Sequence, residues 1–209
     1  MRSTVTIRKG EQWGTIGPAP DDIRVVHSDA EVRALVIAAR AAGTELPPMA
    51  LLGGDLMKTV GGTGDATRLQ GDVPVLPIDV VRVESPGRDT TWCVAHLVAR
   101  RSWWRDEIVA AMNAQHIGSW DVTPRGHPND GRIDLVRVAA SMSIRDRLQA
   151  RRRLPQGTHV PHPDIEVRQV SSTTIELARA TRIWIDGERW GSVTSITLTV
   201  EPDALLVVV

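Results

Sequence analysis

Residues 124–134 gather most of the groups that could do chemistry. The segment reads Pro-Arg-Gly-His-Pro-Asn-Asp-Gly-Arg-Ile-Asp, so two carboxylates, Asp130 and Asp134, and the imidazole of His127 precede an apolar run. Proline and glycine set the backbone shape, and Asn-Asp-Gly is a common turn sequence. We therefore expect carboxylate and carbonyl oxygens at the mouth of a sheet, although the same three residues are also typical of a plain hairpin turn.

The composition favours a protein with a substantial hydrophobic core. The chain has 209 residues, a formal net charge of zero and one cysteine, Cys93, so it has no internal disulfide. A chain of this length can bury roughly 70 % of its unfolded surface. A neutral chain has no overall field that attracts nucleic acid or an anionic membrane, so any such contact must be local. Residues 1–14 lack the apolar block of a signal peptide, and we expect a cytoplasmic protein.

The elements that must position these groups begin with a strand-helix-strand unit. Ile23–His27 is a compact apolar run typical of a buried strand. Ser28 and Glu31 have the spacing of a helix capping box, and Gly43 marks the end of the helix. Met49–Leu52 supplies a second strand, and the glycine-rich exit of such a parallel pair is where open α/β sheets place ligands.

The chain changes character near residue 70. Before the strand-helix-strand unit, Thr4–Ile7 could be a short strand and Gly14–Asp22 a loop. The later sequence consists mostly of short strand-like segments separated by turn residues, as in a β-sandwich. It is interrupted by two predicted helices, over Asp106–Gln115 and Ile144–Arg153. We therefore expect an α/β domain over residues 1–70 and a β-sandwich domain over residues 71–209.

Several segments in order resemble bacterial diacylglycerol kinases and related lipid kinases. Pro124–Leu135 is similar to that family's proline followed by Asp-Gly-x-(apolar)-Asp, and Asp186–Glu188 to its late Asp-Gly-Glu turn. Gly157–Ile165 resembles the family's loop between these two segments, and Pro77–Asp79 resembles the strand that begins its second domain. Leu52–Gly61 is similar to a shortened form of the family's Gly-Thr-Gly-Asn-Asp motif. The resemblance implies an α+β fold of the NAD kinase and diacylglycerol kinase type, a β-sandwich with a small truncated α/β layer.

The phosphate-binding part of that pattern is altered. Where the family has Gly-Gly-Asp-Gly-Thr, residues 27–31 read His-Ser-Asp-Ala-Glu, so side chains replace the bare amides that cradle phosphates. Carboxylates at that place repel phosphate, and we expect ATP to be a poor ligand. The sequence before this loop is also much shorter than in the family. The positions implied to face a nucleotide are Ser28, Asp29, Gly53, Gly54 and Asp55.

The acceptor side of the pattern is better preserved. By resemblance, Asp130 with the backbone oxygens of Ile133 and Leu135 would hold Mg²⁺, a cation that prefers oxygen ligands. By the same resemblance, Glu188 would be the general base that takes a proton from a lipid hydroxyl. The alternative for Asp186–Glu188 is a hairpin turn without a chemical role.

The histidines offer a second metal hypothesis. His159 and His162 lie in a proline-rich loop, and the implied fold brings His127 and Asp130 near them. Imidazoles and a carboxylate could bind Zn²⁺ or another transition metal. The alternative is that these histidines hydrogen-bond to loop backbone. His27, His96 and His116 are isolated and receive no role.

Basic and aromatic residues could either contact a ligand or membrane or have only a structural role. Five arginines between residues 145 and 153 could contact an anionic headgroup, although a solvated helix face is the simpler interpretation. Residues 102–105, Ser-Trp-Trp-Arg, could lie at a membrane interface or be buried under the sandwich.

Three functions follow from the sequence. The first is a lipid-kinase-like protein without kinase activity, a ligand-binding or regulatory module for an anionic lipid or a small phosphorylated ligand. The second is an ATP- and Mg²⁺-dependent phosphotransferase with an alcohol acceptor, completed by oligomerisation. The third is a metal-dependent hydrolase that uses His127, His159, His162 and Asp130. We expect no nucleic-acid partner, at most peripheral membrane contact, and self-association through surface that the short α/β half leaves uncovered.

Overall fold

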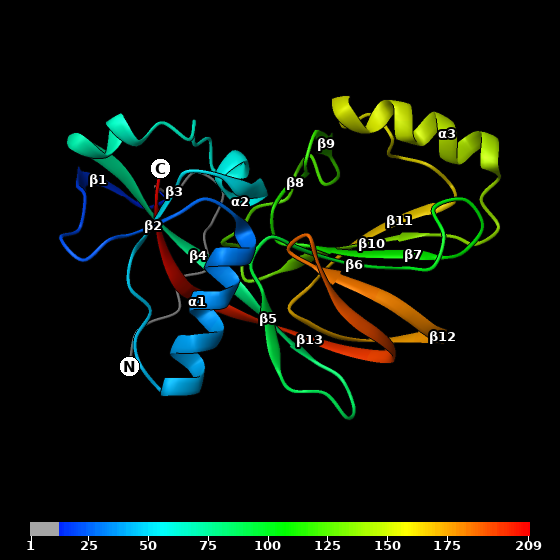
Figure 1. Cartoon of the computed structure of the whole chain (residues 1–209). Helices are drawn as coiled ribbons and strands as arrows, with labels where there is room; N and C mark the ends of the chain where they lie inside the picture. The colour runs from blue at the N-terminus through cyan, green and yellow to red at the C-terminus, as the bar shows by residue number, and fades with distance from the viewer. Residues whose placement is uncertain (1–12) are drawn as a thin grey trace.

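The structure is a computed structural model that describes residues 13–209, so the strand predicted for Thr4–Ile7 lies outside the described part of the chain. Eleven strands form one sheet. Eight of them follow the order β1-β4-β13-β12-β6-β7-β10-β11, while β3 pairs with β13, β2 with β3 and β5 with β4, and β8 and β9 form a separate hairpin. Helices α1 and α3 lie far apart in Figure 1, on different parts of this sheet. In chain order the elements are β1 (Thr15–Pro18), β2 (Arg24–Val26), α1 (Asp29–Ala42), β3 (Met49–Leu51), α2 (Gly54–Thr59), η1 (Ala66–Gln70), β4 (Asp72–Glu84), β5 (Thr91–Cys93), β6 (His96–Arg100), β7 (Ile108–Met112), β8 (His116–Ile117), β9 (Trp120–Asp121), β10 (Ile133–Val138), α3 (Ile144–Arg153), η2 (Leu154–Gln156), β11 (Ile165–Val170), β12 (Ser172–Ile185) and β13 (Glu188–Val208).

The predicted strand-helix-strand unit is confirmed. Strands β2 and β3 pair in parallel, and α1 connects them. The Ser28 hydroxyl accepts a hydrogen bond from the Glu31 amide, while the Glu31 carboxylate accepts one from the His27 amide. Gly43 ends the helix in the left-handed conformation with φ 64°, which a glycine adopts without strain.

Strand β13 joins the N-terminal layer to the sandwich. Its last residues pair in parallel with β3, with Val207 opposite Met49, while its earlier part pairs with β4 and β12. Strand β1 lies on the free edge of β4, within the stretch predicted to be a loop, because Thr15 finds a partner in Val75. The α/β layer is therefore an extension of the same sheet.

The segment Asp106–Gln115 is a strand, and its predicted helix is wrong. Ile108–Met112 forms β7, paired with β6 on one side and β10 on the other, and all five residues are buried. A short apolar run does not distinguish a buried strand from a helix by spacing alone, so pairing on both sides decides the outcome.

The buried side chains form three clusters. One fills the sandwich and includes Ile183, Ile196 and Leu198 from the long C-terminal strands. The second lies between α1 and the sheet and includes Val36 and Leu51. The third lies under α3 and combines residues of β6, β7 and β10 with Met142, just before α3, and Ile165, the first residue of β11. The helix α1 and the helix α3 thus cover separate cores.

Helix α3 is not only a solvated arginine face, because Arg147 is buried. The Arg147 guanidinium donates hydrogen bonds to four backbone carbonyls, which belong to two loops flanking the helix. They are the carbonyls of Trp103, Asp106, Ala139 and Met142. One side chain therefore holds α3 against the sheet by satisfying oxygens that would otherwise be buried without donors.

We predict that Arg147→Met destabilises the protein by about 2–4 kcal/mol, because it leaves several buried carbonyls without donors. Urea unfolding measures the loss. The matched control is Arg152→Met on the exposed face of the same helix, which should stay within about 0.5 kcal/mol of the parent. Equal effects of the two substitutions would contradict the structural role of Arg147.

Candidate functional site

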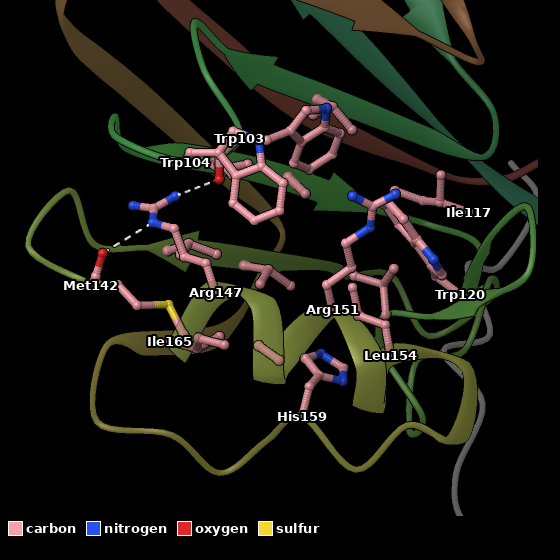
Figure 2. A pocket seen from close by; sticks show the side chains of 17 residues that line it. Trp103, Trp104, Ile117, Trp120, Met142, Arg147, Arg151, Leu154, His159 and Ile165 are labelled. Atoms are coloured by element: carbon pink, nitrogen blue, oxygen red, sulfur yellow. Dashed lines mark hydrogen bonds between the residues drawn. The ribbon is translucent and has the colours of Figure 1, made fainter. Parts of the chain in front are cut away.

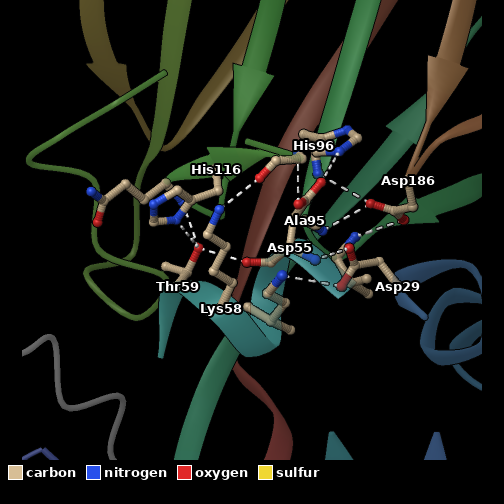
Figure 3. A network of polar contacts seen from close by, with 12 residues as sticks. Asp29, Asp55, Lys58, Thr59, Ala95, His96, His116 and Asp186 are labelled. Carbon is tan, nitrogen blue, oxygen red and sulfur yellow. Dashed lines mark hydrogen bonds and ion pairs between the residues drawn. The ribbon is translucent and has the colours of Figure 1, made fainter. Parts of the chain in front are cut away.

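The predicted nucleotide-loop residues do come together, at the carboxyl ends of β2 and β3. Asp29 lies beside the start of α2 (Figure 3). Its carboxylate accepts hydrogen bonds from the Asp55 amide at 2.6 Å and the Leu56 amide at 3.1 Å. These are the free amides at the start of α2. Burial is the main cause that raises the pKa of Asp29, to about 6. A carboxylate of the protein itself thus occupies the donors that an anionic ligand would need.

The glycines beside Asp29 serve close packing. A Cβ on Gly53 would fall on the carbonyl oxygen of His27, and a Cβ on Gly54 would fall on the carboxylate of Asp29. Gly54 also has φ 98°, which side chains rarely adopt. Both positions require glycine because α2 lies so close to the turn between β2 and α1. Ser28, in this turn, is the N-cap of α1.

Asp55 links this layer to the sandwich. Its Oδ2 lies 3.0 Å from Nε2 of His96, and its Oδ1 accepts a hydrogen bond from the Gly118 amide at 2.7 Å. Burial alone lowers the pKa of His96, but the bond to Asp55 and the nearby carboxylates outweigh it, and the net pKa is raised. His96, which the sequence left without a role, is therefore part of the junction.

Asp186 completes the junction from the sandwich side. It lies with Gly187 in the turn between β12 and β13, at φ 49°, and its side chain points inward. The carboxylate accepts hydrogen bonds from three successive amides, those of Val94, Ala95 and His96. Burial raises the pKa of Asp186. Asp186 and Gly187 thus form a hairpin turn, and the Asp186 carboxylate also binds the bend between β5 and β6.

Glu188, the predicted general base, lies next to this turn. It is ion-paired with Arg33 of α1, and Arg33 also donates a hydrogen bond to the carbonyl of Ile185 at 2.7 Å. The Glu188 side chain is 63 % exposed, so water can reach it. The carboxylate therefore fastens α1 to the sandwich, and its role as a base stays a prediction.

The turn at residues 124–134 is organised by a carboxylate outside it. Asp79 of β4 is buried, and it accepts hydrogen bonds from the amides of Gly131 at 2.7 Å and Asp203 at 3.0 Å. Burial is the main cause that raises its pKa to about 6. Asp134 is also buried, and burial raises its pKa to about 6 as well. The acidic groups are thus used to shape loops.

Asp130 lies at the mouth of the sheet as expected. Its two oxygens accept hydrogen bonds from the Arg132 amide at 2.9 Å and the Gln169 side chain at 3.3 Å. Ile133 and Leu135 belong to β10, which lies between β7 and β11, so their backbone groups are in the sheet ladder. The three residues do not offer a ready set of oxygen ligands, and Mg²⁺ at this place stays a prediction.

The structure does not gather the predicted histidine set. His127 packs edge-on against Trp13 with ring centroids 4.6 Å apart, and Nδ1 of His162 accepts a hydrogen bond from the Asp164 amide. His159 is buried in a separate cavity. Between residues 13 and 209 there is no group of three or more His, Cys, Asp or Glu side chains that could hold a metal ion. The described residues therefore give no support to a metal centre of His127, His159, His162 and Asp130, because these histidines contact different neighbours.

A cavity of about 220 Å³ lies under α3 (Figure 2). Its walls come from β6, β7 and β10, from α3, and from Trp103, Trp104 and Trp120, and they are mostly apolar. Trp103 and Trp120 meet edge-on with ring centroids 5.7 Å apart, and Trp103 and Trp104 both line the cavity, while contact with a membrane stays a prediction. The spacing of these residues in the sequence gave no sign of a cavity.

Cationic and aromatic side chains lie in the lining of this cavity and next to it. The guanidinium of Arg151 lies about 6 Å from the rings of Trp104 and Trp120, at 5.9 and 5.8 Å. Arg100 lies between Trp103 and Trp184, at 4.2 and 4.3 Å from their ring centroids. Such stacked cations favour anionic groups beside an apolar opening. No helix among residues 13–209 is long and apolar enough to cross a membrane.

The architecture is that of the NAD kinase and diacylglycerol kinase-like proteins. Residues 93–209 match the family described as YegS C-terminal NAD kinase beta sandwich-like domain, and the chain belongs to this family. Two structures of a putative diacylglycerol kinase from Bacillus anthracis str. Sterne are similar in fold, with TM-scores of 0.67 and 0.65 and identities of 14 % and 13 %. Each match covers 90 % of this chain and 78 % of the other. A comparison with curated proteins gives no match.

We predict that the junction loses stability as the pH rises. In the folded protein the pKa of Asp29 is raised from the ordinary value of 3.8 to about 6. Its protonated carboxyl therefore contributes stability that is fully present below pH 3.8 and is lost as the pH rises through about 6. Asn does not titrate, so Asp29→Asn should lose less stability than the parent between pH 4.5 and 7.5, by about 1–2 kcal/mol.

Urea unfolding at the two pH values measures this difference. Asp79 and Asp134 titrate in both proteins, so their contributions cancel in the comparison. Asp21→Asn, at an exposed position, is the matched control and should follow the parent. Parallel pH dependence of Asp29→Asn and the parent would show that Asp29 is not buried as the structure has it.

Proposed function

We propose that this chain is a lipid-kinase-like protein that does not use ATP as a phosphoryl donor and instead binds an amphipathic ligand in the cavity under α3. The observation that carries the proposal is the carboxylate of Asp29 on the free amides of α2. The domain boundary near residue 70 belongs to the same proposal: the short α/β layer serves as a cover for one end of the sandwich.

The electrostatics of the junction support the loss of a nucleotide site. Asp29, Asp55 and Asp186 approach one another closely enough that each raises the pKa of a neighbour. A nucleotide phosphate would have to enter this group of carboxylates and displace Asp29 from its amides. The imidazole inside the group is His96, and its Nε2 already lies 3.0 Å from Oδ2 of Asp55. The residues present therefore do not fit ATP.

The cavity supports the ligand-binding part of the proposal. An apolar cavity of roughly 150 Å³ is enough to bind benzene, and this one is larger. Its apolar walls suit a hydrocarbon chain, and the guanidinium of Arg151 suits an anionic or polar head. A lipid-type amphiphile has both parts.

A second candidate is an active kinase completed by another copy of the chain. One observation favours it: a groove between α1 and β2 is left uncovered, with Val25, Leu35 and Ala38 among its lining. Strand β2 pairs only with β3 among the described strands, so one edge is open. Self-association there would fit the uncovered face.

Isothermal titration calorimetry with ATP and Mg²⁺ separates the two candidates. We expect no saturable binding at millimolar nucleotide, because the protein carboxylates hold the amides. Saturable binding by the monomer would overturn the proposal. Binding that appears only at concentrations where sedimentation shows a dimer would favour the second candidate.

Chain binding is tested with a brominated fatty acid, which quenches nearby tryptophans by contact. We expect saturable quenching, because three tryptophans line the cavity. Ala110→Leu places extra atoms inside the cavity and should weaken binding at least about tenfold, since a filled pocket excludes the chain. The matched control, Ala180→Leu, is exposed on β12 and should bind as the parent does. Equal binding by the two variants would place the ligand elsewhere.

A further inference from the structure

His159 is a polar side chain left without partners inside the apolar cavity. It is 5 % exposed, and neither ring nitrogen makes a hydrogen bond. Figure 2 shows the ring rising from the loop after η2 and lying among the lining side chains, close to Leu154. Among residues 13–209, His159 is the only cavity-lining residue that has buried side-chain polar atoms without a partner.

A buried group of this kind requires an explanation. Buried polar atoms are nearly always paired, because losing water without gaining a partner is unfavourable. A leucine of similar size would fill the same space at no such cost. The imidazole therefore has the properties of a group kept ready for a ligand atom that enters the cavity.

The two arginines that line the cavity are placed differently from His159. Four N–H groups of Arg147 donate to backbone carbonyls, and the guanidinium of Arg151 lies over tryptophan rings. Among the lining side chains, His159 is the one whose buried polar atoms have no partner, and most of the surrounding walls are apolar.

The protonation state of His159 defines the chemistry it can recognise. Burial lowers the pKa of His159, and the nearby backbone of Val122 and the carboxylate of Asp121 only partly offset this. The ring is therefore neutral at pH 7 and has one donor and one acceptor nitrogen. Such a ring matches a neutral hydroxyl or carbonyl group.

We propose that the cavity selects an apolar chain that carries a neutral oxygen group, a hydroxyl or a carbonyl, in the part of the chain that enters the cavity, and that His159 hydrogen-bonds to this group. The inference rests on the proposed function, since it requires that a chain enters the cavity. It adds the class of ligand: an oxygenated chain is preferred over a plain hydrocarbon chain.

The experiment measures displacement of the brominated fatty acid by two series of competitors. One series contains saturated fatty acids of 10 to 18 carbons, and the other contains the same acids with a single hydroxyl moved along the chain. The proteins are the parent, His159→Leu and His159→Gln. Glutamine keeps a donor and an acceptor, whereas leucine keeps only the volume.

We expect the parent to bind at least one hydroxylated chain about tenfold more tightly than its plain counterpart, the ratio that one buried hydrogen bond supplies. His159→Leu should abolish this preference and bind plain chains at least as well as the parent. His159→Gln should retain part of the preference. These three results together support the inference.

A second measurement tests the unpaired state directly. Without ligand, His159→Leu should unfold at a temperature equal to or higher than the parent, because it removes a buried polar group that has no partner. A large fall in the unfolding temperature would show that His159 is bonded within the protein and would overturn the inference.

The outcomes separate the two proposals. If plain and hydroxylated chains displace the brominated fatty acid from the parent protein equally well, the role of His159 is overturned while chain binding in the cavity stands. If the brominated fatty acid does not bind the parent at all, the proposed function fails, and the inference fails with it.

Discussion

The junction between the α1 layer and the sandwich depends on buried carboxylates that are satisfied by backbone amides. The Asp29 carboxylate accepts hydrogen bonds from two amides at the start of α2, and the Asp186 carboxylate accepts them from three amides at the bend between β5 and β6. Removing a carboxylate from water is unfavourable unless such donors replace the lost hydration. Because the junction uses its amides in this way, the interaction that closes it also removes the donors that a phosphate group would require.

The other end of the molecule has a different physical character. The core under α3 is separate from the core under α1, and it is held by Arg147 and by packing of apolar side chains. A change in the junction therefore does not have to disturb the cavity. The cavity under α3 and the carboxylate junction are thus physically separate parts of one sheet.

Local signals in the sequence predicted much of the fold. The capping box at Ser28 and the terminal Gly43 define α1 through contacts within a few residues, and the structure confirms both. The Asp186 turn was also visible, because a turn is a local feature. The helix predicted for residues 106–115 is wrong, because the pairing of β7 with two distant strands decided its conformation. His96 was overlooked because its partner, Asp55, is 41 residues away.

The sequence by itself determined the strand-helix-strand unit of β2, α1 and β3, the altered phosphate loop and the resemblance to a lipid-kinase sandwich, because each depends on residues close together in the chain. Only the tertiary structure decided where the side chains act. It showed that Asp29 occupies the α2 amides, that Arg147 is buried, and that His159 lies unpaired in a cavity. These facts depend on burial and on partners from distant segments. Spacing along the chain carries no information about which groups lose water when the segments pack together.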